Sequence, residues 1–279
     1  MIKSLLLPID GSNYSETVLQ YGIFLAQKFG AVLRILTVVD IRLYEWNMAA
    51  GADTFVPVMP STEFQEESHR MLDSKADQVL EKAGEVVTTS GISFKMIKVT
   101  GNPVDEILEY SKTNDLVVMG IRGEYERWSN NLLGATVESI TRQIGKPVML
   151  VEKKFEPVEH IICGYDGSAS ANKALQLSAY YSSAMGLKLQ VISVFDSQEE
   201  REAVLKEAET YLEPYKIEYQ LRHESGDVDT ILVNAQSNMP GPSLMVIGSY
   251  GHSRLREAII GSTTVQVMRK ADKPVLLAK

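Results

Sequence analysis

Glycine and hydroxyl residues at fixed spacing mark one segment of the sequence, GSYGHSRLREAIIGSTT. Two residues separate Gly248 from Gly251, and nine separate Gly251 from Gly261. Ser262 and Thr263 follow at once. Glycines let a ligand come close to the backbone, and hydroxyls at the start of a helix can donate to a phosphate beside the unpaired N–H groups of the first turn. The segment therefore predicts a phosphate-binding loop.

The residues around this segment favour that interpretation. The apolar run SLMVI before Gly248 predicts a buried strand, and STTVQVMRK after Gly261 predicts a helix. In doubly wound α/β sheets, ligands bind beyond the carboxyl ends of the strands. The spacer holds Arg254 and Arg256, whose cations could reach phosphate oxygens. The alternative is that the glycines only close a tight turn between the strand and the helix.

The chain contains two copies of one unit. PIDGSNYSETVLQYGIFLAQKFGAVLRILTVVD aligns without gaps with GYDGSASANKALQLSAYYSSAMGLKLQVISVFD, so that Asp10 meets Asp166. Further along, LVVMGIRG matches LMVIGSYG, and both copies end in an apolar run preceded by Lys-Pro. A charged segment that contains proline, EKKFEPVEH, joins the copies. We therefore expect two domains, residues 1–153 and residues 154–279.

Each copy alternates short apolar runs with amphipathic stretches, which predicts the order β, α, β, α, β, α, β, α, β. Gly30 and Gly186 are the predicted stop signals of the first helix in each copy. This order indicates an α/β fold with a parallel, Rossmann-like sheet and helices on both faces. The first copy is longer, mostly through an insertion at about 41–64 that is rich in Met, Pro and aromatic residues. The insertion is either a packed surface loop or a lid or partner surface.

The glycine pattern, within this order of strands and helices, resembles the ATP-binding signature of the universal stress protein family. The resemblance covers both halves, so the chain is similar to a tandem, two-domain member. It implies a five-stranded parallel sheet of order 3-2-1-4-5 in each domain. It also implies that the last strands of two domains pair antiparallel to form a dimer. Here Val148–Val151 and Val275–Ala278 would pair within one chain, as an intrachain pseudo-dimer, and a homodimer is a further expectation.

The resemblance also implies nucleotide-contacting residues in each copy. In the second, preferred copy these are Tyr165, Asp166, Val194, Ile247, Gly248, Gly251, Gly261, Ser262 and Thr263, to which we add Arg254 from the spacer. In the first copy they are Asp10, Val38, Met119, Gly120, Gly123, Gly134 and Thr136. A carboxylate such as Asp166 suits a ribose hydroxyl and would repel a phosphate. The alternative for Asp166 is an Asx turn that starts the helix, and both roles can hold together.

The first copy departs from the family pattern. Ten residues lie between Gly123 and Gly134, and Ala135 replaces the serine, so that one hydroxyl donor is lost. The spacer carries Glu124 and Glu126, which would repel a triphosphate. We therefore expect ATP in the second copy. The first copy takes a nucleotide such as AMP, a different small molecule, or none.

The overall composition disfavours several classes of protein. The formal net charge of −8 argues against binding nucleic acid, which demands a positive field. No run approaches the roughly 18 apolar residues of a membrane span, and the N-terminal apolar run is too short for a signal peptide, so a cytoplasmic location without a membrane partner is expected. Cys163, the single cysteine, is expected to be a buried small hydrophobic residue. The four histidines have no metal-ligand spacing, so no metal site made by the protein is expected.

These observations favour nucleotide binding over turnover. The sequence has no P-loop and no dinucleotide fingerprint after the first strand, and no residue is placed as a general base for a γ-phosphate, so we expect no catalytic residue and at most weak ATPase activity. The expected function is a cytoplasmic, ATP-binding sensor or regulator in the stress response, with any Mg²⁺ held through the phosphates and ADP or AMP as alternative ligands. The rival hypotheses are a nucleotide-independent dimerisation scaffold and a slow ATP-hydrolysing enzyme of the same fold class.

Overall fold

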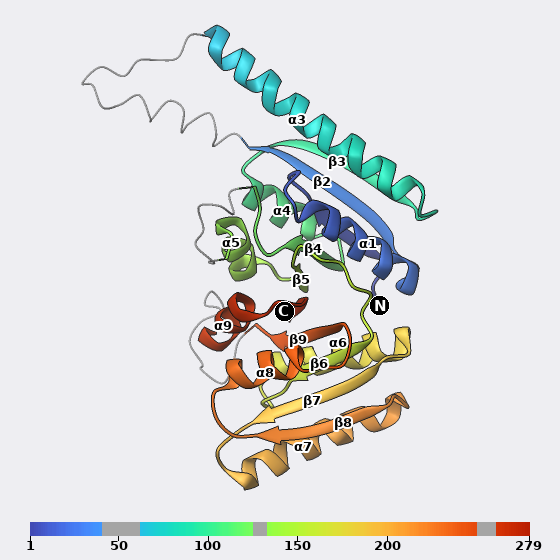
Figure 1. Cartoon of the computed structure of the whole chain (residues 1–279), viewed down its shortest axis with the longest axis vertical. Coiled ribbons are helices and arrows are strands. Elements are labelled where there is room, and N and C mark those ends of the chain that lie inside the picture. The colour runs from blue at the N-terminus through green and yellow to red at the C-terminus, as the bar shows by residue number, and fades with distance from the viewer. Residues whose placement is uncertain (41–61, 125–132, 250–260) are drawn as a thin grey trace, which may run out of the picture.

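The computed structural model describes residues 1–40, 62–124, 133–249 and 261–279, which form two βα units joined through one sheet (Figure 1). The first half (residues 1–153) contains β1 (Ser4–Pro8), α1 (Ser15–Phe29), β2 (Val32–Asp40), α3 (Thr62–Thr88), β3 (Phe94–Gly101), α4 (Pro103–Ser111), β4 (Leu116–Gly120), α5 (Ala135–Gln143) and β5 (Val148–Val151).

The second half (residues 154–279) repeats this order of strands and helices. It contains β6 (His160–Gly164), α6 (Ala169–Met185), β7 (Lys188–Val194), α7 (Gln198–Leu212), a short 3-10 turn (Glu213–Tyr215), β8 (Tyr219–Glu224), α8 (Val228–Ser237), β9 (Ser243–Gly248), α9 (Ser262–Lys270) and β10 (Val275–Ala278). The predicted stop signals hold: Gly30 ends α1 and Gly186 ends α6, both in the left-handed conformation that favours glycine.

The described strands form one ten-stranded sheet in the order β3-β2-β1-β4-β5-β10-β9-β6-β7-β8. Within each half the pairings are parallel, and the order corresponds to 3-2-1-4-5 when strands are counted from the start of that half. The two halves meet where β5 pairs antiparallel with β10, with Leu150 opposite Val275. The last strands thus pair as the family resemblance implies.

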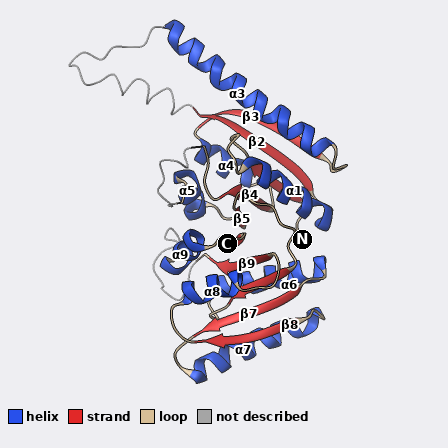
Figure 2. Cartoon of the chain, in the orientation of Figure 1, coloured by secondary structure: helices blue, strands red, loops and turns tan. Residues whose placement is uncertain are grey.

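The core has two layers, one on each face of the sheet. Figure 2 shows the helices that flank the strands in both halves. Successive side chains of β1 belong to different layers, because alternate side chains of a strand point to opposite faces of the sheet. Leu5 and Leu7 lie in one layer and Leu6 in the other. Helices α1, α3, α6 and α7 cover the first layer, and α4, α5, α8 and α9 cover the second. Each layer runs through both halves, so the predicted sheet with helices on both faces is confirmed.

The segment between the halves packs against α1. The Thr17 hydroxyl donates to the carbonyl of Lys153 at 2.7 Å, and the Tyr21 hydroxyl donates to the carbonyl of Glu156 at 3.1 Å. The ring of Phe155 meets Tyr21 edge to face, with 4.8 Å between the ring centroids. The charged joint is therefore held by specific contacts with the first half.

Part of the extra length of the first half lies in a helix. The insertion expected at about 41–64 lies outside the described residues as far as residue 61, and α3 begins at Thr62. Helix α3 has 27 residues, whereas its counterpart α7 has 15. Part of the extra length is therefore a longer helix. Among the described helices, none is both long and apolar enough to cross a membrane.

Candidate functional site

A cavity of about 580 Å³ lies in the first half, beyond the carboxyl ends of β1, β2 and β4. This is where an open α/β sheet places its ligands. All seven residues predicted for the first copy line it: Asp10, Val38, Met119, Gly120, Gly123, Gly134 and Thr136. The N-terminal turn of α5 contributes Ala135 and Thr136, and α3 contributes a wall of its own. The cavity thus collects the sequence-predicted residues of the first copy.

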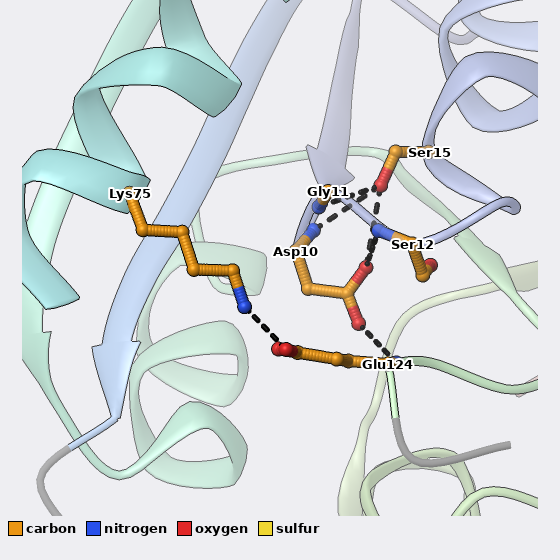
Figure 3. Close-up of polar contacts among 6 residues, drawn as sticks. All are labelled: Asp10, Gly11, Ser12, Ser15, Lys75 and Glu124. Atoms are coloured by element: carbon orange, nitrogen blue, oxygen red, sulfur yellow. Dashed lines mark hydrogen bonds and ion pairs between the residues drawn. The ribbon is translucent and has the colours of Figure 1, made fainter. Parts of the chain in front are cut away.

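Asp10 ties together the turn after β1 and the segment after β4 (Figure 3). Its Oδ1 accepts the backbone N–H of Ser12 at 2.9 Å, which is the hydrogen bond of an Asx turn. The Ser15 hydroxyl also donates to Oδ1, at 3.3 Å. The backbone N–H of Glu124 donates to Oδ2 at 2.9 Å. The Asx turn that was considered as the alternative role of Asp166 is therefore present at the matching Asp10, whatever ligand the cavity takes.

Helix α3 closes one side of the cavity. Leu72, Ala76 and Val79 provide apolar surface there. From the same helix, Lys75 forms an ion pair with Glu124, as Figure 3 shows. The sequence offered no motif for this wall, because these residues belong to an ordinary amphipathic helix. Lys75 nevertheless offsets the charge of a glutamate that was predicted to repel a triphosphate.

Arg122 is held beside the same cavity by two side chains. It donates to the Tyr14 hydroxyl at 3.3 Å and lies 3.7 Å from a carboxylate oxygen of Glu152. Its side chain is largely buried, with 13% exposed. A largely buried guanidinium next to a cavity can bind an anionic group, since it presents several N–H donors at a fixed charge.

The glycines at the strand ends are required by packing against helices. A Cβ on Gly120 would lie 2.5 Å from Cβ of Tyr14, and a Cβ on Gly248 would lie 2.6 Å from Oγ of Ser170. Each glycine therefore lets the first helix of its half pack tightly on the end of the fourth strand. Packing against α6 is thus a structural reason for Gly248 beside its predicted contact with a ligand, which stays a prediction. In the first half, a Cβ on Gly123 would meet Oδ2 of Asp10 at 2.6 Å.

The last helix of each half starts in the same way. The N–H of Gly134 donates to the carbonyl of Ile121, and that of Gly261 donates to the carbonyl of Ser249, both at 3.2 Å. The φ and ψ angles are −60° and 139° at Gly134 and −58° and 141° at Gly261. The one-residue difference in spacer length therefore leaves both helix starts alike. What differs is the side chain that follows, Ala135 in the first half and Ser262 in the second.

The described residues of the second site occupy matching places. Tyr165 is buried, its hydroxyl donates to Oδ1 of Asn172 at 2.7 Å, and burial raises its pKa above the ordinary range. Oδ1 of Asp166 accepts the N–H of Ser168 at 3.0 Å, the same Asx turn as in the first half. Val194 ends β7, and Ile247 is buried near the end of β9.

The helix start of the second half presents three hydroxyls in sequence. Ser262 and Thr263 are exposed at the first turn of α9. Thr264 is buried, and its hydroxyl donates to the carbonyl of Gly248 at 3.1 Å, which fixes the helix start to the end of β9. Two other predicted residues, Gly251 and Arg254, lie outside the described residues. In the described ranges, no group of three or more His, Cys, Asp or Glu side chains could hold a metal ion.

The model of the universal stress protein family matches residues 1–152 and 195–279 of the chain. The chain belongs to the universal stress protein family. Universal stress protein Slr1230 of Synechocystis sp. is 30% identical over 99% of both chains. Universal stress protein Rv2005c of Mycobacterium tuberculosis is 25% identical over 97% of this chain and 95% of its own length.

The fold of this universal stress protein is also that of solved structures. A universal stress protein from Archaeoglobus fulgidus has a TM-score of 0.77 at 23% identity and covers 99% of this chain and 98% of its own. A universal stress protein structure from Pseudomonas aeruginosa has a TM-score of 0.70 at 17% identity and covers 100% of this chain and 93% of its own. The tandem arrangement of the chain is therefore shared along its length.

Proposed function

We propose that this universal stress protein is an adenine-nucleotide-binding regulator, with ATP bound beyond the carboxyl ends of β6, β7 and β9. The observation that carries the proposal is that α5 and α9 begin with the same backbone conformation and hydrogen bond. The start of α5 lines a cavity of about 580 Å³. Because the second half has the same helix start and adds Ser262 and Thr263, it offers more donors to a triphosphate. Any Mg²⁺ would be held through the phosphates.

The roles of the side chains follow from their charge and position. The N–H groups at the start of α9 and the Ser262 and Thr263 hydroxyls would bind phosphate oxygens, because a helix N-terminus attracts anions. Asp166 would accept from a ribose hydroxyl, away from the phosphates. No general base is assigned, so the proposed role is binding, with ATP turnover slow or absent. The proposed site of action is the cytoplasm, in the response to stress.

We also propose that the β5–β10 pair acts as an internal dimer interface, which makes the chain a pseudo-dimer with one nucleotide site in each half. Leu276 lies opposite Met149 in this pair, and all residues of both strands are buried. A homodimer of whole chains would need a further surface. The rival function is a scaffold that needs no nucleotide, and the buried strand pair between the halves favours it as the second candidate.

One experiment separates these two functions. The purified full chain is denatured, and the released small molecules are separated by anion exchange, while a separate nucleotide-free sample is titrated with ATP by calorimetry. ATP in the supernatant and saturable binding support the regulator. No released nucleotide together with no heat of binding at millimolar ATP would favour the scaffold. Replacing Gly261 with valine should abolish binding in the second half, whereas Gly145→Val, at a position with open space around it, should not.

A further inference from the structure

Arg269 lies in the last turn of α9, in the second half, and yet it lines the cavity of the first half. Every other described residue of that lining has a number below 139. The placement of the helices explains how Arg269 reaches the other half. Helices α5 and α9 cover the same layer of the core, on either side of the β5–β10 pair. One half therefore supplies a cation to the cavity of the other.

The buried part of Arg269 is unsatisfied. Its Nε is shielded from solvent and has no hydrogen-bond partner among the described residues. Leaving a buried donor of a charged group unpaired costs free energy. The side chain thus has binding capacity directed at a space large enough for a small molecule.

A comparison with the first half explains why this arginine lacks a local partner. Arg142 occupies the equivalent position in α5 and pairs with Glu138, four residues earlier, at 2.5 Å. In α9 the residue four positions before Arg269 is Val265, which offers no carboxylate. The two halves therefore have equivalent arginines. Because α9 has Val265 where α5 has Glu138, Arg269 is the one of the two that is available for another anion.

Four of the described acidic residues line the cavity: Asp40 lies at the end of β2, and the other three are engaged by groups of the protein. Glu124 pairs with Lys75 and Glu138 pairs with Arg142. Both carboxylate oxygens of Asp10 accept hydrogen bonds from the protein. At the α5 end the first-turn N–H groups and the Thr136 side chain border the same space as Arg269.

We infer that the first-half cavity binds a ligand with a single phosphate group, and that Arg269 of the second half binds that phosphate together with the start of α5. The polar end near Asp10 suits sugar hydroxyls, so the ligand class is a nucleoside monophosphate. This rests on the proposed nucleotide-binding function and adds a residue and a ligand class to it. Because the arginine belongs to the other half, occupancy of the first site fixes the two halves to one another.

The test uses the full chain and a signal that reports on the first half alone. Met119 lines the cavity, whereas the matching position in the second half is Ile247. Methyl-¹³C methionine NMR, with Met119→Leu for assignment, therefore follows AMP and adenosine at the first site. We expect AMP to bind about tenfold or more tightly than adenosine, since a charged hydrogen-bonded pair contributes about 1.5–3 kcal/mol.

Arg269→Ala should weaken AMP binding about tenfold or more and leave adenosine binding unchanged. Lys270→Ala, which removes a cation from the same turn of α9 but does not line the cavity, is the matched control and should leave both affinities within about twofold. If Arg269→Ala lowers the affinities for AMP and adenosine equally, or leaves the affinity for AMP unchanged, the role of Arg269 is overturned. If Arg269→Ala does not fold, Arg269→Lys replaces it, with an expected AMP loss of about threefold, because lysine keeps the charge without the planar fork.

Failure of this inference can be told from failure of the proposed function. If calorimetry detects ATP binding while AMP leaves the Met119 signal of the wild-type chain unmoved, then the second-half site stands and the first-half ligand is wrong. If neither method detects a nucleotide, both fail. A Met119 shift with inorganic phosphate at millimolar concentration that Arg269→Ala removes would support the phosphate contact on its own.

Discussion

The backbone N–H of Glu124 donates to Oδ2 of Asp10 at 2.9 Å, which joins the segment after β4 to the turn after β1. These two points are far apart in sequence but follow neighbouring parallel strands, and both residues line the first-half cavity (Figure 3). Asp10 thus organises the site through its backbone partners. Its effect on stability can be tested separately from any ligand.

Asp10→Ala should lower the free energy of unfolding by about 1–2 kcal/mol, because two backbone N–H groups lose their acceptor. Asp10→Asn keeps one acceptor oxygen and should lose about half as much. Urea denaturation at pH 7 measures both. Equal stability of the alanine variant and the wild type would show that water replaces the carboxylate at no cost.

Gly120→Ala should destabilise the chain by about 1–3 kcal/mol, because the new methyl group would overlap Tyr14 and the carbonyl of Arg122 at the end of β4. Gly145→Ala is the matched control, since nothing lies within 4 Å of its Cβ position. That substitution should change stability by less than about 0.5 kcal/mol. Thermal unfolding of both variants provides the comparison, and similar losses would contradict the packing role of Gly120.

Ser262→Ala should weaken ATP binding in the second half about three- to tenfold, because it removes one exposed hydroxyl donor at the start of α9. Ala135→Ser adds the same donor at the matching position of α5 and should strengthen binding of AMP at the first half. Calorimetry measures the first change and the Met119 methyl signal the second. No effect of Ser262→Ala on ATP would exclude this hydroxyl from the site.

Asp115 should make the stability of the first half depend on acid pH. Partial burial alone would raise the pKa of its carboxyl, but the N–H groups of Lys3 at 2.8 Å and Ser4 at 3.0 Å outweigh this, and the pKa lies below its ordinary value. The stabilisation is then fully present above the unfolded pKa of about 4 and is lost as the pH falls through the lower folded pKa.

The check is the stability difference between the wild type and Asp115→Asn. It should be largest near pH 7 and should shrink as the pH falls below about 4, because the wild-type carboxyl becomes neutral like the amide. Urea denaturation at a series of pH values measures this difference. A difference independent of pH would show that the charge of Asp115 contributes nothing.

Cys163 should be inert in the folded chain. The thiol is fully buried in β6, and burial raises its pKa to about 12, so almost no thiolate forms near pH 8. A disulfide reagent such as Ellman's reagent should not react with the thiol of the folded chain in buffer. In urea, where the chain is unfolded, it should react with one thiol per chain. Rapid reaction of the folded chain would mean that β6 opens readily.

The sequence by itself determined the plan of this protein. The gapless match of its two halves, the apolar runs and the glycines at residues 30 and 186 specify the order and the ends of the elements, because these depend on local chemistry. The two aspartates that follow β1 and β6 could be singled out for the same reason; the Asx turn considered for Asp166 is present, and Asp10 forms the same turn. Even the pairing of β5 with β10 followed from a resemblance carried by local motifs.

Only the tertiary structure decided what surrounds each site. Lys75 belongs to a helix without a motif, and Arg269 looks like any basic residue near the end of a helix; both reach the first-half cavity through long-range packing. The roles of Gly120 and Gly248 were likewise hidden, since the atoms they accommodate lie on helices elsewhere in the chain. A repeat encodes what its two copies share, whereas the contribution of Arg269 to the other half's cavity depends on how the two halves pack.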